Sequence, residues 1–197
     1  MRDRLTKYML YTRKGDNGTT KLFVCPGGVR LSKSEVVFTA LGTLDELNCS
    51  LGYAKVLSGK SEDSLGVFGC KTPYTALLEH FQNVLFTIQA EVGGADKHPT
   101  KEDVEFTEHI VYEVETLLPP VNSFIVSGGS ETGAYLDICR TIARRAERTV
   151  ILACEKNIHC ASANTLQFLN RLSSVLYALA RFANYQEGFT EHSPTYQ

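Results

Sequence analysis

The most regular pattern in this sequence is an apolar repeat near its C-terminal end. Between Asn164 and about Gln186, leucine and alanine recur every three to four positions for several turns, which is the spacing of one buried face on an α-helix. This face comprises Leu166, Leu169, Leu172, Leu176, Leu179 and Ala183. Because a helix cannot cover its own apolar face, the repeat predicts that other helices pack beside it.

Glycine, proline and capping residues divide the preceding sequence into four more helical segments, predicted over 43–58, 74–92, 100–118 and 130–154. Thr43 and Glu46 form a capping-box signature for the first segment, while Thr100 and Ser130 can cap the third and fourth. The predicted core positions are Leu44, Leu47, Leu51, Ala54, Leu77, Phe81, Val84, Ile88, Ile110, Val114, Leu117, Ile138, Ile142, Ala146 and Val150.

These segments predict an all-α fold, a five-helix up-and-down bundle in a single domain over 1–197. Residues 1–41 are rich in Gly, Thr and Lys without sustained periodicity, so we expect an irregular leader there. The bundle is predicted over 42–187 and a tail over 188–197, with a long polar connection between Gly59 and Pro73.

Charge and hydropathy exclude several classes of protein. The formal net charge of -2 gives no bulk positive field for binding nucleic acid. No apolar run approaches the roughly 18 residues that a membrane span needs, and the first ten residues lack a signal-peptide core. We therefore expect no nucleic-acid partner, no membrane partner and a cytoplasmic location.

The six cysteines contain no C-x-x-C pair, which argues against a zinc ribbon or a thioredoxin-like site. Buried free thiols are the favoured interpretation. Cys154, His159 and Cys160 are close enough in sequence to suggest metal ligands, but a single cluster without a partner pair is a weak signal.

The fourth segment carries a charged stripe. Asp137, Arg140, Arg144, Glu147 and Arg148 share one helical face, so three arginines lie in a row. Arginine presents a fixed fork of donors to phosphate oxygens, which suits a polyphosphate ligand. The alternative is a solvated face with charge pairs one turn apart.

A second anion signal lies in the leader, over Thr12–Lys21. Its glycines allow backbone N–H groups to turn toward one point, with hydroxyls and cations around it. The segment is not a P-loop, because G-x-x-x-x-G-K-[ST] is absent, and an Asp-Asn-Gly surface hairpin explains it equally well. The chain also lacks G-x-S-x-G, H-E-x-x-H and G-x-G-x-x-G, so conventional nucleophilic catalysis is unsupported.

Five blocks together resemble the cobalamin adenosyltransferases associated with propanediol utilisation and with human methylmalonic aciduria. In chain order they are YTRKGDNGTTKLF, GTLDELNCSLGYA, FIVSGGS, CRTIARRAERTVI and FLNRLSSVLYALARFAN. The resemblance implies a homotrimer that binds ATP between neighbouring subunits, held by the leader of one and the fourth helix of the other. The implied ATP contacts are Thr12, Arg13, Lys14, Gly15, Thr20, Lys21, Lys33, Arg144, Arg145, Glu147, Arg148 and Asn170.

The resemblance also implies a reaction. The 5′-deoxyadenosyl group of ATP, accompanied by Mg²⁺ on its phosphates, passes to the cobalt of cob(I)alamin. Arg144, Phe124 and Asn170 are the implied catalytic residues, with Phe124 against the lower face of the corrin. Asp45 and Arg140 resemble an intersubunit ion pair. A corrinoid reductase and an adenosylcobalamin-dependent mutase are the implied protein partners.

Three positions depart from the family pattern. Ser174 replaces an aspartate after L-N-R-L-S, Thr39 replaces an acidic residue before A-x-G-T, and the segment Phe23–Gly28 is longer than the usual F-G-G. Two alternatives therefore stay open: an ATP- or corrinoid-binding carrier or regulatory bundle without turnover, and a purely structural oligomer in which the arginine row is an interface.

Overall fold

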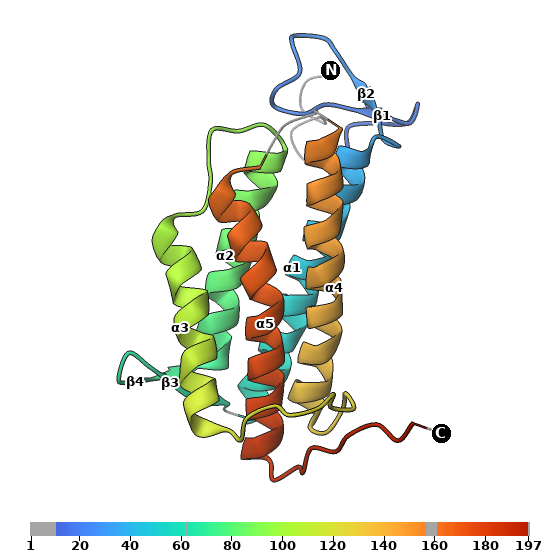
Figure 1. The fold of residues 1–197 in the computed structure, drawn as a ribbon. Coiled ribbons are helices and arrows are strands. Elements are labelled where there is room, and N and C mark those ends of the chain that lie inside the picture. The colour runs from blue at the N-terminus through green and yellow to red at the C-terminus, as the bar shows by residue number, and fades with distance from the viewer. Residues whose placement is uncertain (1–10, 62, 157–160, 197) are drawn as a thin grey trace.

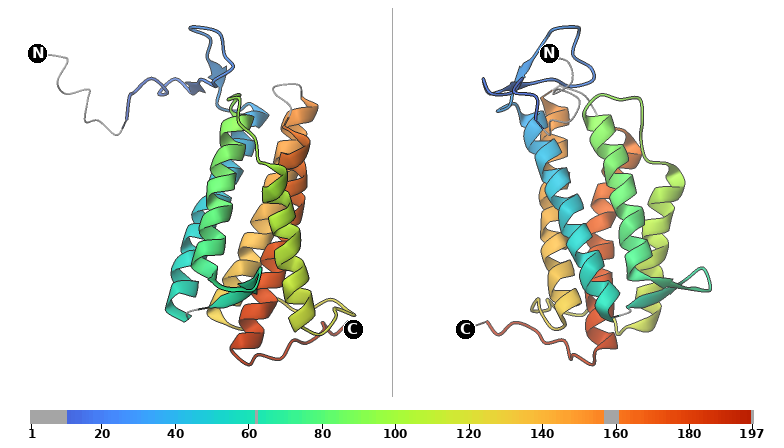
Figure 2. Two further views of the ribbon diagram at one scale, coloured as in Figure 1. Left: turned by 90° about the vertical axis from the view of Figure 1, so that its left-hand side faces the viewer. Right: turned by 180° about the vertical axis from the view of Figure 1, so that it is seen from behind.

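The computed structural model describes residues 11–61, 63–156 and 161–196 and confirms the five-helix bundle (Figure 1). The helices are α1 (Val36–Ser61), α2 (Tyr74–Val92), α3 (Lys101–Leu117), α4 (Glu131–Glu155) and α5 (Ala163–Gln186). Successive helices run in opposite directions, which both views in Figure 2 show. Within the described ranges, no helix has the length and apolar character needed to cross a membrane.

The core lies where α5 packs against α3 and α4, and where α1 packs against α2 and α4. Most predicted core residues are buried, but Leu117 and Ile138 are 48% and 51% exposed. Leu118, one residue beyond α3, takes the inward position instead of Leu117. In α4 the buried stripe runs through Leu136, Cys139 and Ala143, so Ile138 turns outward. The other residues of both predicted stripes are buried, so each error concerns one residue at the end of its stripe.

Helix α1 begins earlier than the sequence predicted. It starts at Val36, so Thr43 lies inside the helix, and the predicted capping box is wrong. The Thr43 hydroxyl donates to the Thr39 carbonyl oxygen at 2.8 Å, which satisfies it within the helix. Six residues of α1, 36–41, come from the stretch assigned to the irregular leader.

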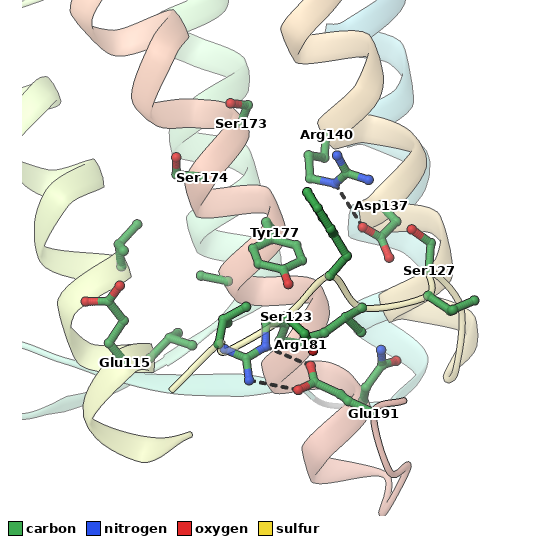
Figure 3. Close-up of a pocket in the computed structure, with 18 of the residues that line it drawn as sticks. Glu115, Ser123, Ser127, Asp137, Arg140, Ser173, Ser174, Tyr177, Arg181 and Glu191 are labelled. Carbon is green, nitrogen blue, oxygen red and sulfur yellow. Dashed lines mark hydrogen bonds and ion pairs between the residues drawn. The ribbon is translucent and has the colours of Figure 1, made fainter. Parts of the chain in front are cut away.

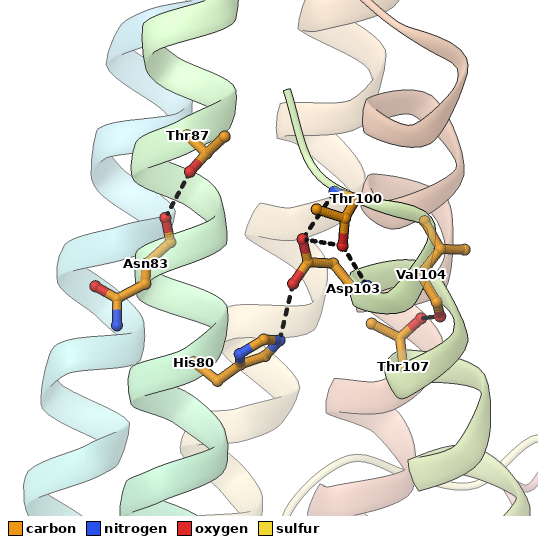
Figure 4. Close-up of polar contacts among 7 residues, drawn as sticks. All are labelled: His80, Asn83, Thr87, Thr100, Asp103, Val104 and Thr107. Atoms are coloured by element: carbon orange, nitrogen blue, oxygen red, sulfur yellow. Dashed lines mark hydrogen bonds and ion pairs between the residues drawn. The ribbon is translucent and has the colours of Figure 1, made fainter. Parts of the chain in front are cut away.

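Thr100 caps the start of α3 as predicted, and the structure shows that the cap is reciprocal with Asp103 (Figure 4). The Asp103 N–H donates to the Thr100 hydroxyl at 3.2 Å, and the Thr100 N–H donates to the Asp103 carboxylate at 2.8 Å. His80 of α2 approaches the same carboxylate, with Nε2 3.5 Å from Asp103 Oδ1. Burial lowers the pKa of His80, and the Asp103 carboxylate only partly opposes that shift.

Two short antiparallel hairpins interrupt the helical pattern. Strands β1 (Thr19–Thr20) and β2 (Leu31–Ser32) pair in the leader, and β3 (Ser64–Val67) and β4 (Cys70–Pro73) pair between α1 and α2. Leu65 and Val67 of β3 are buried in the core. Within the predicted polar connection between Gly59 and Pro73, residues 59–61 therefore belong to α1, and residues 64–73 form a hairpin whose first strand packs on the core.

The irregular segments of the protein lie at opposite ends of the bundle. The leader lies at the end where α1 begins, and the loop from α3 to α4 lies with the C-terminal tail at the other end (Figure 1). A backbone hydrogen bond of 2.9 Å from the Phe23 N–H to the Gly93 carbonyl fixes the leader to the end of α2. Candidate ligand-binding residues near each end are thus held by separate supports.

Candidate functional site

Arg30 organises the leader. Its Nη2 donates to the Lys14 and Thr19 carbonyl oxygens, each at 2.6 Å, and its Nε donates to the Thr19 hydroxyl at 2.8 Å. These bonds join the turn around Lys14 to strand β1, so one guanidinium sets the shape of the loop. Asn17 completes the turn by accepting from the Thr19 hydroxyl at 2.7 Å. The leader therefore forms a hairpin, and the fixed backbone of that hairpin has the shape of a cradle for an anion. The two interpretations of Thr12–Lys21, a surface hairpin and an anion-binding segment, are thus compatible.

The cradle has cations around it. Lys33 Nζ lies 3.0 Å from the position that a Cβ would occupy at Gly15, so glycine allows the ammonium group to approach the backbone closely. Arg13 has a φ of 58° and its guanidinium lies 5.4 Å from the centre of the Tyr11 ring. Thr12, Lys14 and Lys21 are exposed and Thr20 is half-buried. The leader thus offers several positive charges on a fixed backbone.

The α4 row divides in the folded chain. Arg144 and Arg148 are exposed, and within the described residues neither has a hydrogen-bond or ion-pair partner. Arg145 points to α1 and forms an ion pair with Glu46. Glu147 faces α5, where its carboxylate accepts from Asn170 Nδ2 at 2.9 Å. Two unpaired guanidiniums remain available for an anion.

A cavity of about 760 Å³ lies between α3, α4, α5 and the loop that joins α3 to α4 (Figure 3). Arg140 and Arg144 line it from α4, Tyr177 and Ser174 line it from α5, and Phe124 lines it from the loop. Phe124 is 80% exposed, so its ring is free to pack against a ligand. A pocket with an apolar ring and guanidiniums suits a large, partly polar molecule.

Charges alternate along the wall of this pocket. Arg140 Nε donates to Asp137 at 2.9 Å, and its guanidinium also stands 5.9 Å from the centre of the Tyr177 ring. The Arg181 guanidinium lies 6.0 Å from the same ring, so Tyr177 sits between two cations. Burial raises the pKa of Tyr177, with Arg181 opposing the shift. Tyr177 therefore remains a neutral phenol at neutral pH.

The single chain brings only some of the predicted site residues together. Phe124, Arg140 and Arg144 share the pocket, while the leader residues form their own group. Asp45 is exposed, and Arg140 pairs with Asp137 of its own helix instead. Ser174, the departure from the family pattern, lines the pocket.

Sequence reasoning missed Arg30, Tyr177, Arg181, Asn184 and Glu191. Arg181 carried a signal, because it is a charged residue between Ala180 and Phe182 in an apolar helix. The other four gave no signal above an ordinary polar or aromatic residue.

No metal cluster is found among the described residues, and the buried Cys139 is not a reactive thiol. In those ranges, no group of three or more His, Cys, Asp or Glu side chains could hold a metal ion. His159 and Cys160 of the suggested cluster lie outside the described residues. Burial raises the pKa of the Cys139 thiol to about 12, so this cysteine is not a nucleophile at neutral pH.

Comparison with known sequences decides the family. The model of the cobalamin adenosyltransferase family matches residues 10–183, which include most of the leader, the arginine row and Phe124. The chain belongs to the cobalamin adenosyltransferase family. The match ends at Ala183, so Asn184 and Glu191 lie outside the matched residues.

Relatives that are named corrinoid adenosyltransferases align with most of this chain. A corrinoid adenosyltransferase of Mycobacterium leprae is 33% identical over 89% of this chain and 91% of its own length, and the human MMAB protein is 32% identical over 92% and 71%. The PduO protein of Citrobacter freundii is 38% identical over 87% of this chain. The chain spans about half the length of the two PduO relatives it matches, at 49% and 48%.

Solved structures of the same family share the fold of this cobalamin adenosyltransferase chain. A variant of the PduO-type ATP:corrinoid adenosyltransferase from Lactobacillus reuteri, complexed with cobalamin and ATP, has a TM-score of 0.80 and 27% identity. The alignment covers 94% of this chain and 96% of that one. Another variant of that enzyme, complexed with ATP, has a TM-score of 0.79.

Proposed function

We propose that this protein transfers the 5′-deoxyadenosyl group of ATP to the cobalt of cob(I)alamin, giving adenosylcobalamin and triphosphate. The observation that supports it most is the pocket, in which the exposed Phe124 ring faces a wall that carries Arg140 and Arg144. The pocket occurs in a chain of the cobalamin adenosyltransferase family, and a member of that family has been solved with both cobalamin and ATP.

The proposed chemistry requires no nucleophile from the protein. The lone pair of Co(I) attacks C5′, a cobalt–carbon bond forms, and the C5′–oxygen bond breaks with its electron pair going to triphosphate. The chain must align the two substrates and stabilise the charge on the leaving group. Among the described residues Arg144 and Arg148 have no partner and are available for that charge, and Asn170 bonds to Glu147 of their helix.

Phe124 supports the reduction step in this proposal. Its exposed ring at the pocket would occupy the lower face of the corrin and displace the lower axial ligand. Four-coordinate Co(II) is easier to reduce to Co(I), and we propose that a corrinoid reductase supplies the electron. An adenosylcobalamin-dependent mutase is the proposed acceptor of the product, and a cytoplasmic location is part of the same proposal.

The two groups of ligand-binding residues support a site shared in a homotrimer. The leader lies at one end of the bundle and the Phe124 loop at the other (Figure 1). Arg140, Arg144 and Arg148 follow α4 away from the pocket, over about 12 Å at 1.5 Å per residue. In the proposal, a neighbouring leader, with Thr12–Gly15, Thr20, Lys21 and Lys33, covers triphosphate laid along this row, and Arg145 and Glu147 border it.

Asp45 supports the same assembly, because it is exposed and could meet Arg140 of a neighbour. Magnesium fits as a companion of ATP, since the described residues offer no cluster of metal ligands but the triphosphate itself has hard oxygen donors.

The deciding experiment mixes the purified protein with ATP, Mg²⁺ and chemically reduced cobalamin. Formation of adenosylcobalamin and triphosphate in equal amounts is expected. Binding of both substrates without product would instead favour a carrier or regulatory bundle. No ATP binding at millimolar concentration, measured by calorimetry, would favour a structural oligomer.

A further inference from the structure

The loop that carries Phe124 has no helix or strand of its own. It runs from Leu118 to Ser130, and Phe124 stands near its middle with its ring exposed. A segment of this length without regular backbone pairing must be held by side chains or by other segments. The supports of this loop therefore decide where the Phe124 ring lies.

Two residues one turn apart near the end of α5 hold the two ends of the loop. Arg181 is buried, and its Nη2 donates to the Pro119 carbonyl oxygen at 3.0 Å. Asn184 is also buried and donates to the Gly128 carbonyl oxygen at 2.9 Å, while its own oxygen accepts from the Ser130 N–H at 2.8 Å. A Cβ at Gly133 would lie 2.1 Å from Asn184 Oδ1, so α4 leaves room for this amide only by having glycine there.

The tail forms the third support. Glu191 accepts from Arg181 through both carboxylate oxygens, at 2.7 Å and 2.8 Å, in a bidentate pair (Figure 3). The hydrogen bond with Glu191 raises the pKa of Arg181. The Val126 N–H donates to the His192 carbonyl at 3.0 Å, and the hydroxyls of Ser123 and Ser193 lie 2.7 Å apart. The tail thus contacts the loop on both sides of Phe124.

We infer that Arg181, Asn184 and Glu191 are positioning residues, which fix the Phe124 loop at the pocket and make the tail part of the active site. This inference rests on the proposed function and deepens it. None of the three transfers a group or electron. The Arg181 guanidinium also lies against the ring of Tyr177, which in turn contacts Arg140. Arg181 therefore supports two further residues that line the pocket with Phe124.

The test compares Glu191→Ala, Glu191→Gln and Glu108→Gln. Glu108 forms a matched carboxylate–arginine pair with Arg171 at 3.0 Å on the surface and is the control.

Two measurements are made: amide hydrogen exchange over 119–130 without substrates, and the fraction of four-coordinate Co(II) in the ATP complex by electron paramagnetic resonance. For Glu191→Ala we expect faster exchange over 119–130, a four-coordinate fraction reduced severalfold, and kcat lowered about tenfold with ATP affinity within about twofold of wild type. Glu191→Gln should fall between Glu191→Ala and wild type, and Glu108→Gln should match wild type.

A double variant, Arg181→Leu with Glu191→Leu, replaces the charged pair by apolar packing and so separates positioning from folding. Loss of four-coordinate Co(II) in a double variant with wild-type melting temperature supports the inference. An unchanged rate of amide exchange over 119–130 in Glu191→Ala would show that Arg181, Asn184 and Glu191 do not hold the loop. A faster rate with an unchanged fraction of four-coordinate Co(II) would show that they hold the loop but do not position Phe124 for the reaction. If the wild-type protein makes no adenosylcobalamin, the proposed function and the positioning role are both overturned. The rate of amide exchange still decides separately whether Arg181, Asn184 and Glu191 hold the loop.

Discussion

The leader and the Phe124 loop are both irregular, yet they are held in different ways. Arg30 ties the leader to itself through Lys14 and Thr19. In the described part of the leader, the buried Leu22 and one backbone bond from Phe23 to the end of α2 join it to the bundle. The Phe124 loop is tied to the bundle core by buried side chains of α5. A locally supported segment can adapt to a neighbouring subunit, whereas a core-supported one fixes geometry before any ligand arrives.

Between the two lies the arginine row of α4, and Arg144→Ala is expected to have the largest effect on catalysis. Removing one free guanidinium should cost about 2 to 4 kcal/mol of transition-state stabilisation, because it withdraws a partner from the leaving triphosphate. Steady-state kcat/KM for ATP measures this. Lys55→Ala removes an equal charge beside Glu79 and should leave kcat/KM unchanged. Wild-type turnover in Arg144→Ala would exclude the role.

The comparison sharpens if assembly is disturbed through Arg140→Ala. We expect a trimer dissociation constant raised by about ten- to a hundredfold, because the proposed partner Asp45 is left without its cation. Analytical ultracentrifugation over a range of protein concentrations measures this. Within its own chain Arg140 also pairs with Asp137, so Asp45→Asn, which leaves that pair intact, is the matched variant. Unchanged mass and kinetics in both variants would count against the intersubunit pair.

Arg30→Ala breaks the local support of the leader alone. The loss of three hydrogen bonds should raise the KM for ATP about tenfold with a smaller change in kcat, because the cradle loses its shape but not its cations. Arg30→Lys keeps the positive charge but lacks the planar set of N–H donors of the guanidinium, so it should recover only part of the affinity for ATP. Hydrogen exchange over 119–130 should stay at the wild-type rate. If it changes, the leader and the loop are not supported independently.

The smallest effect is expected from pH at the α2–α3 contact of the bundle. The folded-state pKa of His80 is lowered, so the neutral form stabilises the fold fully above the unfolded value of about 6.5, and this stability is lost as pH falls below it. From pH 7.5 to pH 5.5, wild type should lose about 1 to 3 °C more in melting temperature than His80→Gln. His98→Gln, at an exposed histidine, should follow wild type. An equal loss in wild type and His80→Gln would contradict this role.

The helices and their buried faces could be predicted because their spacing is a local property of the sequence. Thr100 and Ser130 cap helices as expected, since a cap depends on three or four neighbouring residues. Thr43 misled because the same signature also fits inside a helix, where the hydroxyl bonds to the preceding turn. In the site, the resemblance identified Phe124 and Arg144, which share the pocket. Arg181 stood out as a charge in an apolar helix, but its partner Pro119 is distant in sequence. Asn184 and Glu191 could not be found, because Asn184 bonds to the distant backbone of 128–130 and Glu191 lies in an irregular tail.

The bidentate contact between Glu191 and Arg181 has a practical consequence for handling the protein. A fusion that replaces residues 188–196 would take Glu191 away from Arg181 and leave the Phe124 loop without the support of the tail. The exposed Gly69, at the turn of the β3–β4 hairpin beside α3, offers a different insertion point, and an insertion after it keeps the Phe68 ring stacked on His109.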